Sequence, residues 1–484
     1  MKEWLAWING ETLLCRNSLC GRIIRERGCV GMLMKTKYIY EKNLDGYLFL
    51  LNLLTFEYIL LNHDDVITWK TEEFEKLSVS SILKEKLFLV EKDYLFDIVQ
   101  RKMTRKGNLG SNHNIFITDE CNQKCPYCFE KEIGALRKYN RVLNKFQVDK
   151  IFEMILKLNK KYARSDGKVI LFGGEPLLLK NKEIVRYILE MSKQTNLAPV
   201  DIVTNGTTLQ HFFDLILQYE STINGIIVTI NGLKDVHERM RGSEENPSFN
   251  IIIKNLITLL SICKKITIQV NVLVGQGNVH NLGALLDYLR EKDLLGNARV
   301  DVVFGRIQSR FHPDLGREKG ELPYTDYYPN LLKLYFEVPN MKIEMLSGSE
   351  MDILGRMFRF WNREGYVVPA LNACEAVYPG RYCYYVDGNI YPCTEIAGMS
   401  RYSIGNYIEG RMYKEEEKWR QYKVCQLAKC KECKYIAFCN GACPVSNLGM
   451  NGKIDDVYCL DIEEALDKMI CTLYEKGYFK SEII

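Results

Sequence analysis

Cysteine placement is the feature that most constrains this chain. Its 484 residues contain 17 cysteines, and ten of these lie between Cys374 and Cys471. The first residues carry Lys2 and Glu3 and no apolar signal segment, so we expect a cytoplasmic protein. Disulfides are a poor explanation for thiols in that compartment. Clustered cysteines under reducing conditions indicate metal binding or catalysis.

The remaining composition excludes several classes of protein. Lys and Arg total 65 against 61 Asp and Glu, and this near balance gives no reason to expect a nucleic-acid partner. Hydrophobic residues make up 47% of the chain, which excludes wholesale disorder. The longest apolar stretch, Leu48–Leu61, is interrupted by Asn52 and Glu57 and is too short to span a membrane.

The middle of the chain alternates short apolar runs with helical patterns. Such alternation predicts a parallel sheet, open or curved into a partial barrel, with functional residues in the loops after the strands. The predicted strands are Asn114–Thr118, Val169–Phe172, Val200–Thr204, Gly225–Ile230, Ile266–Val274 and Arg299–Phe304. The predicted helices are Phe146–Leu158, Asn181–Ser192, Thr208–Tyr219, Ile251–Cys263 and Leu282–Arg290.

A small α+β module is predicted before this region. The sequence Asn43-Leu-Asp-Gly46 is typical of a hairpin turn. We expect a helical stretch over Leu53–Leu61, a helix after Thr71 and an extended pair around Leu87–Phe96. Whether residues 1–33 belong to the folded module is left open.

Three cysteines follow the first predicted strand directly, in the order Cys121-x3-Cys125-x2-Cys128. Three thiolates can hold three irons of a cubane cluster, whereas a fully protein-ligated 4Fe–4S site needs four. The next cysteine is the distant Cys263. One iron would therefore stay open to a small molecule. The alternatives are a partial zinc site or three unrelated buried thiols.

The chain here resembles the radical S-adenosylmethionine (SAM) enzymes, whose signature is Cys-x3-Cys-x-aromatic-Cys, with Tyr127 as the aromatic residue. The resemblance implies a partial (β/α)6 barrel in which the three cysteines hold a catalytic 4Fe–4S cluster that binds SAM. It extends through the stretch Gly173–Pro176, which looks like the family segment that binds the SAM amino group. Glycines let a ligand approach the backbone closely.

Further family segments that contact SAM match the ends of the third and fourth strands. For Asn205 and Asn231 an ordinary role in turns is an equal alternative. Asn231 stands where the family usually has Asp. The arginine after the fourth strand implies a bidentate partner for the SAM carboxylate. The resemblance assigns SAM contacts to Tyr127, Gly173, Gly174, Glu175, Pro176, Thr204, Asn205, Asn231 and Arg239.

The C-terminal cysteines form a second pattern. Four cysteines between residues 430 and 443 would, alone, suggest zinc. The full set resembles the SPASM extension of radical SAM peptide-modifying enzymes, which implies two auxiliary 4Fe–4S clusters. Carried over, Cys374, Cys393 and Cys443 hold the first cluster, with Cys383 the best candidate for a fourth ligand and Cys425 a competitor. Cys430, Cys433, Cys439 and Cys459 hold the second.

Together these resemblances imply four regions: a peptide-recognition-like, winged-helix-like module over residues 1–108, the radical SAM barrel over 109–310, a bridging region over 311–369 and the SPASM domain over 370–484. The implied cofactors are SAM and three 4Fe–4S clusters. The implied partners are a precursor peptide with a leader sequence, captured by strand addition, and a flavodoxin or ferredoxin as electron donor. A plain dimerisation or packing role for the N-terminal module remains an alternative.

Thioether formation between a Cys sulfur and a carbon is the leading reaction. In the branch that matures sulfatases, an Asp follows the cysteine of Gly-x4-Cys and acts as a base. Here Thr394 and then Glu395 follow Cys393, so the chain departs from that branch. Epimerisation, carbon–carbon cyclisation and backbone excision of a peptide, and sulfatase maturation, remain alternatives. So does an iron–sulfur or zinc module without SAM chemistry.

Overall fold

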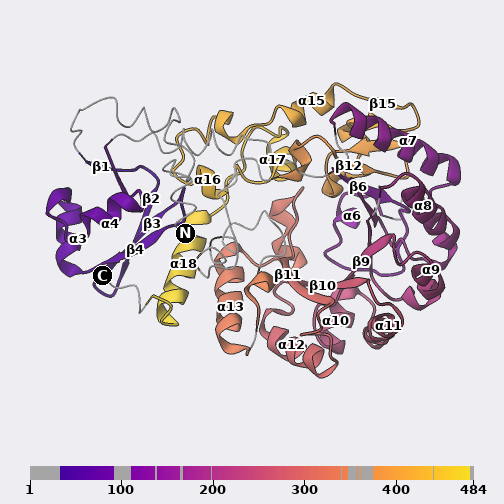
Figure 1. The fold of residues 1–484 in the computed structure, drawn as a ribbon, viewed down its shortest axis with the longest axis horizontal. Helices are drawn as coiled ribbons and strands as arrows, with labels where there is room; N and C mark the ends of the chain where they lie inside the picture. Colours follow the sequence, from indigo (N-terminus) through magenta and orange to yellow (C-terminus); the bar gives the residue numbers. More distant parts are fainter. Residues whose placement is uncertain are drawn as a thin grey trace.

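The central sheet defines the architecture of this computed structural model (Figure 1). The structure describes residues 33–91, 111–136, 139–163, 167–197, 199–339, 341–346, 357, 361, 374–439 and 441–479. In this part of the chain, ten strands form one sheet in the order β11-β10-β9-β8-β7-β6-β12-β13-β14-β15. Two smaller sheets belong to the N-terminal module.

The six strands predicted for the barrel are present, and their mutual pairing is parallel throughout. Each strand lies beside the next one in the sequence, as expected for repeated strand–helix units. The strands are β6 (Ser111–Phe116), β7 (Gly167–Phe172), β8 (Val200–Thr204), β9 (Ile223–Thr229), β10 (Thr267–Val274) and β11 (Val300–Arg306).

Helices cover the outer face of these strands (Figure 1). The first is fixed locally, because Asn144 and Gln147 form a capping box at its N-terminus. The predicted helix over Thr208–Tyr219 consists of a 3-10 turn at Leu209–Phe212 followed by a short α-helix. The helices are α7 (Lys145–Lys161), α8 (Lys182–Gln194), α9 (Phe213–Gln218), α11 (Phe249–Ile262) and α12 (Leu282–Glu291). Sequence analysis missed α6 (Phe129–Glu132) and α10 (Lys234–Arg241).

The cysteine-rich C-terminal region is attached to the edge of the barrel sheet. Strand β12 (Arg381–Tyr384) runs parallel to β6, and Cys383 lies opposite Asn114 in that pairing. The antiparallel strands β13 (Asn389–Tyr391), β14 (Gly405–Asn406) and β15 (Arg411–Met412) continue the sheet. The remaining helices are α13 (Tyr324–Glu337), α15 (Glu415–Arg420), α16 (Ile436–Cys439), α17 (Pro444–Asn451) and α18 (Ile462–Glu475).

The N-terminal module is a three-stranded antiparallel sheet of β2 (Ile39–Leu44), β3 (Tyr47–Asn52) and β4 (Tyr58–Leu61). The predicted hairpin turn is present: Asp45 and Gly46 between β2 and β3 both have positive φ, 43° and 89°. The module also contains α3 (His63–Lys70), α4 (Ser80–Glu85) and the short strand pair β1 (Met34–Lys35) and β5 (Leu89–Val90).

The predicted helical stretch over Leu53–Leu61 is wrong, because its second half is strand β4. Leu60 packs into the large core that continues through the barrel, whereas Ile59 and Leu61 pack into a second, smaller core under α3 and α4. A strand buried on both faces is apolar at every position, so its sequence lacks the alternation that identifies a half-buried strand. The expected strand after residue 91 and all of residues 1–32 lie outside the described residues.

The module packs against the C-terminal helix α18, which lies beside its sheet in Figure 1. Tyr40 and Lys42 of β2 both bind Asp467 of that helix, Lys42 Nζ at 2.7 Å. The Phe49 and Phe479 rings lie 5.0 Å apart. The N-terminal module and the segment that contains Phe479 therefore share one core. None of the described helices has both the length and the apolar character that a membrane span requires.

Candidate active site

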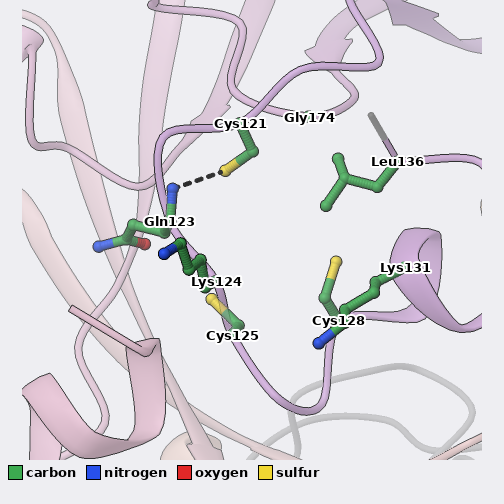
Figure 2. A pocket seen from close by; sticks show the side chains of 8 residues that line it. All are labelled: Cys121, Gln123, Lys124, Cys125, Cys128, Lys131, Leu136 and Gly174. Carbon is green, nitrogen blue, oxygen red and sulfur yellow. Dashed lines mark hydrogen bonds between the residues drawn. The ribbon is translucent and has the colours of Figure 1, made fainter. Parts of the chain in front are cut away.

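The three-cysteine loop follows β6 and leads directly into the short helix α6. Cys121, Cys125 and Cys128 are half-buried and line a cavity of about 140 Å³. Figure 2 shows the Cys121 and Cys128 side chains on opposite sides of this space, with Gly174 and Leu136 completing its wall. The structure thus brings the predicted cluster ligands together at the end of β6.

The environment of these thiols suits a bound metal centre. Burial, with a smaller contribution from Glu175, raises the pKa of Cys121 to about 12. Burial, aided by Glu130, raises the pKa of Cys128 to about 12 as well. Such thiols stay protonated at neutral pH unless a cation stabilises the thiolates. The cavity lining contains no fourth cysteine among the described residues, so the donor set fits a cluster with one open iron.

The stretch after β7 lies directly on the cysteine loop. A Cβ on Gly174, where φ is +51°, would lie 2.1 Å from the Glu120 carbonyl oxygen, and one on Gly173 would overlap the Phe116 ring. The Glu175 N–H donates to the same Glu120 carbonyl at 2.7 Å. Only glycine permits this approach, so the two glycines are required by contact with the loop, independently of any ligand.

Glu175 connects this stretch to the end of β8. Its carboxylate is buried and accepts hydrogen bonds from the Leu177 N–H, the Thr204 hydroxyl and the Asn205 N–H, at 2.9, 2.6 and 2.6 Å. Burial raises its pKa even though these donors act in the opposite direction. The carbonyl of Pro176 accepts from Asn181 Nδ2 at 3.2 Å. The predicted SAM contacts of the second and third strands therefore form one network.

Asn205 and Asn231 both bind the cysteine loop. Asn205 Nδ2 donates to Asn122 Oδ1 at 2.7 Å and lies 3.9 Å from the Cys121 sulfur. Asn231, at the end of β9, donates to the Tyr127 hydroxyl and accepts from the Leu273 N–H at 3.0 Å. Tyr127 is thus held by its hydroxyl group between the loop and the sheet, and the asparagines contribute to the position of the loop.

The two arginines of α10 occupy different environments. Arg239 is exposed, and its one hydrogen bond in the described residues is to the Gly277 carbonyl at 3.4 Å. Arg241 is buried and donates to Gln123 Oε1 at 2.9 Å and to the Tyr127 hydroxyl at 3.2 Å. Burial lowers the pKa of Arg241, but Cys125 and Tyr127 raise it by more. The pKa is therefore raised overall, and the guanidinium stays charged beside the loop.

Sequence analysis missed Arg241, Gln123 and Glu130 as components of this site. For Arg241 a signal existed, since it is two residues, or about 200° of helical rotation, from Arg239. The two side chains must therefore point to different sides of the helix, but the sequence does not say which of them faces the sheet. Glu130 carried no signal, because its hydrogen bonds to Gly174 N–H join segments that are 44 residues apart.

The cysteines assigned to the first auxiliary cluster come together from three segments. The Cys393 thiol interacts electrostatically with those of Cys374, Cys443 and Cys383, and Cys374 interacts with Cys443. Burial raises the pKa of Cys374 to about 12 and also raises those of Cys393 and Cys383. Cys383 is 2% exposed, and its thiol lies within electrostatic range of Cys393.

The cysteines assigned to the second auxiliary cluster form a separate group. Cys430 interacts electrostatically with Cys439, Cys433 and Cys459, and Cys439 with Cys433 and Cys459. Burial raises the pKa of Cys430 to about 12 and that of Cys439 to about 11. Apart from the four-residue helix α16, the described backbone over residues 427–439 and 441–443 consists of turns, bends and irregular positions. Segments of this kind usually depend on bound metal for their structure.

Among the described residues, no three His, Cys, Asp or Glu side chains converge closely enough to hold one metal ion. A cubane cluster spaces its protein ligands more widely, since each thiolate binds a different iron. The three groups of thiols therefore need not converge so closely to hold cubane clusters.

Arg310 and Glu395 lie beside the first auxiliary group. Arg310 Nε and Glu395 Oε1 are 3.6 Å apart, and the arginine also interacts electrostatically with Cys443 and Cys393. Burial raises the pKa of Glu395 while Arg310 lowers it. The carboxylate nearest to Cys393 in the sequence is therefore paired with a cation.

Comparisons with known proteins agree with the fold. Residues 115–278 match the model of the Radical SAM superfamily. A GTP 3',8-cyclase of Staphylococcus epidermidis is 27% identical over 254 residues, 50% of this chain and 66% of the relative, so the chain spans less than two thirds of that protein. A GTP 3',8-cyclase of Clostridium acetobutylicum is 37% identical over 95 residues, 20% of this chain and 27% of that protein.

Two solved structures share the architecture. The structure of anSMEcpe with bound AdoMet has a TM-score of 0.57 and 17% identity, covering 78% of this chain and 96% of its own. Streptococcus suis SuiB bound to the precursor peptide SuiA has a TM-score of 0.51 and 15% identity, covering 89% and 99%. The predicted fold class, a parallel-strand α/β core with a cysteine-rich C-terminal region, is confirmed. Residues 115–278 form a radical SAM domain, which implies a 4Fe–4S cluster and SAM, and the chain is an enzyme built on that domain.

Proposed function

We propose that this chain is a cytoplasmic radical SAM peptide maturase that joins a Cys sulfur to a carbon in a ribosomally synthesised precursor peptide. The observation that carries the proposal is the arrangement of eleven cysteines in three separate groups, one at the end of β6 and two in the C-terminal region. An enzyme that only cleaves SAM needs the first group alone. The other two suit a reaction that must also remove an electron.

When bound, SAM and the clusters supply hydrogen abstraction by a 5'-deoxyadenosyl radical and an acceptor for the electron released as the sulfur–carbon bond closes. The protein binds and orients these groups. Cys121, Cys125 and Cys128 hold the first cluster. Gly173–Pro176 would bind the methionine end of SAM, while Thr204 and Asn205 fix the neighbouring end of β8 through their hydrogen bonds to Glu175.

Arg241 suits the SAM carboxylate better than Arg239 does. Its guanidinium is buried against the cysteine loop, where its two observed hydrogen bonds use only part of its five donors. A charge in this desolvated position binds an anion more strongly than an exposed one. Arg239 lies at the surface on the other side of α10. We therefore assign the carboxylate contact to Arg241.

Thr394 and the Arg310–Glu395 pair support cross-linking over sulfatase maturation. Thr394 stands where the maturases of sulfatases carry an aspartate base. The next residue, Glu395, faces Arg310 at 3.6 Å, so its charge is already compensated. Cys374, Cys383, Cys393 and Cys443 hold the first auxiliary cluster in this proposal. Cys430, Cys433, Cys439 and Cys459 hold the second.

The N-terminal module would bind the leader of the peptide by strand addition to β2. Among the described strands, β2 pairs only with β3, so its other edge has no partner strand. Glu41 and Asn43 are exposed on β2. A flavodoxin or ferredoxin supplies electrons. The proposal draws support from SuiB, which shares the fold and was solved bound to the precursor peptide SuiA.

The test is anaerobic reconstitution with dithionite, SAM and the peptide encoded beside this gene, followed by mass spectrometry. We expect 5'-deoxyadenosine and a product two mass units lighter, with one Cys no longer alkylated by iodoacetamide. A product that loses two mass units while every Cys stays free indicates a carbon–carbon bond. Unchanged mass with solvent deuterium incorporated indicates an epimerase, and loss of a larger fragment indicates backbone excision. Absence of 5'-deoxyadenosine contradicts SAM chemistry altogether.

A further inference from the structure

Two glutamates flank the three-cysteine loop, and both bind one short segment at the end of β7. Before the loop, the Glu120 carbonyl accepts from the Glu175 N–H at 2.7 Å. After the loop, both carboxylate oxygens of Glu130 accept from the Gly174 N–H, at 3.0 and 3.1 Å. The two ends of the loop are therefore tied to adjacent residues.

Position 174 accepts no residue other than glycine. Its φ is +51°, and its α-carbon is so close to the Glu120 carbonyl that no side chain would fit. Gly174 also lines the cavity between the thiols, as does Leu136 (Figure 2). The Leu136 N–H donates to the Glu130 backbone carbonyl at 2.9 Å. Glu130 thus binds two residues that line the cavity.

Glu130 is 4% exposed, and in the described residues its carboxylate hydrogen bonds go to Gly174. Burying a carboxylate costs free energy when it accepts so few hydrogen bonds. Its geometry joins two segments that carry different halves of the site: α6, which follows Cys128, and the glycine stretch after β7.

We propose that Glu130 is a positioning residue, whose carboxylate clasps Gly174 and so fixes both the spacing of the three thiols and the place of the SAM-binding stretch. This inference rests on the proposed function, in that the thiols hold an iron–sulfur cluster. Groups that orient metal ligands from outside the ligand set typically affect metal affinity or activity 10- to 100-fold. We expect an effect of that size from loss of the clasp.

Three variants test the clasp in the reconstituted enzyme. Glu130→Ala removes the acceptor and should release iron from the loop to a chelator about 10- to 100-fold faster and weaken SAM binding by a similar factor. Glu130→Gln retains one carbonyl acceptor for the Gly174 N–H and should stay within about threefold of the unmodified enzyme. Hydrogen exchange of a peptide covering residues 173–178 should quicken in the alanine variant and be restored in the glutamine variant.

Glu132→Ala is the matched control. Glu132 lies on the same helix with a side chain that is 4% exposed, but it binds Ser309 and Lys319 and not Gly174. It should leave iron release, SAM affinity and exchange at residues 173–178 unchanged. The clasp is refuted if Glu130→Ala matches the unmodified enzyme in these measurements, or if the glutamine and control variants lose as much as the alanine variant. Lack of iron in the unmodified loop would instead contradict the proposed function, while exchange at residues 173–178 would still report on the clasp.

Discussion

Replacing Arg241 with Met should weaken SAM binding far more than replacing Arg239 with Met. The two arginines lie two residues apart on α10, and their substitutions remove the same charge from the same helix. Only Arg241 is buried against the cysteine loop, where it donates to Gln123 and Tyr127. The pair therefore separates the effect of position from the effect of net charge.

The expected magnitudes follow from these environments. Truncating one partner of a buried, hydrogen-bonded charge pair costs about 2–5 kcal/mol, which corresponds to about 30-fold to about 4,000-fold in affinity. Arg239 makes one contact, at 3.4 Å, from an exposed position. Surface substitutions usually change a free energy by less than about 0.5 kcal/mol, or about twofold in affinity. Arg241→Met also removes two charge-assisted hydrogen bonds, so some loss of folding stability is expected.

The assay is anaerobic calorimetric titration of each reconstituted variant with SAM. Iron content and the midpoint of thermal unfolding are measured on the same samples, so that a variant that has lost its cluster is recognised. Arg241→Lys retains the charge but not the planar fork, and its affinity should fall between those of Arg241→Met and the unmodified enzyme. The reasoning is refuted if Arg239→Met loses more SAM affinity than Arg241→Met while both variants retain their iron.

Four further outcomes are expected. Changing all three cysteines of the loop to Ala should remove about four of about twelve irons per chain and abolish 5'-deoxyadenosine formation; residual formation would move the active cluster elsewhere. Cys383→Ala should reduce the iron of the first auxiliary group, whereas the competitor variant Cys425→Ala should not; the reverse result would exchange their roles. Asn43→Pro removes an N–H at the open edge of β2, so it should weaken peptide binding without affecting SAM cleavage, and unchanged peptide affinity would place the leader elsewhere. Burial lowers the pKa of His113 to about 4 from 6.5, so the unfolded chain binds the extra proton between these values. The free energy of unfolding should therefore fall by about 3 kcal/mol as the pH drops from 6.5 to 4, and His113→Asn should flatten that dependence in thermal unfolding curves; an unchanged slope would contradict this origin.

The structure also changes how the N-terminal module can be tested. Deleting residues 1–100 is the simplest experiment that the sequence suggests. However, Phe49 packs against Phe479 and Lys42 binds Asp467, so the deletion would expose part of the main core. A point substitution on the exposed side of β2 leaves that packing intact. For this reason Asn43→Pro is the more informative experiment.

The local parts of this protein could be predicted well from the sequence. Each barrel strand is identified by a short apolar run, and the five predicted helices between the strands by their periodicity, because these signals depend on neighbouring residues. The loop cysteines are likewise close in sequence, so their spacing alone indicates a shared site. The error over Leu53–Leu61 has a tertiary cause: β4 lies between two cores, and this removes the alternation by which strands are recognised.

The sequence by itself determined the order of the barrel strands and which three cysteines share the loop after β6, since both depend on residue types at short spacings. Tertiary structure alone decided which arginine of α10 faces the loop, because that depends on the helical phase relative to the sheet. It also decided that Glu130 binds Gly174. Hydrogen bonds between distant segments leave no local pattern, and the convergence of Cys374, Cys393 and Cys443 could be expected only by resemblance until the fold brought them together.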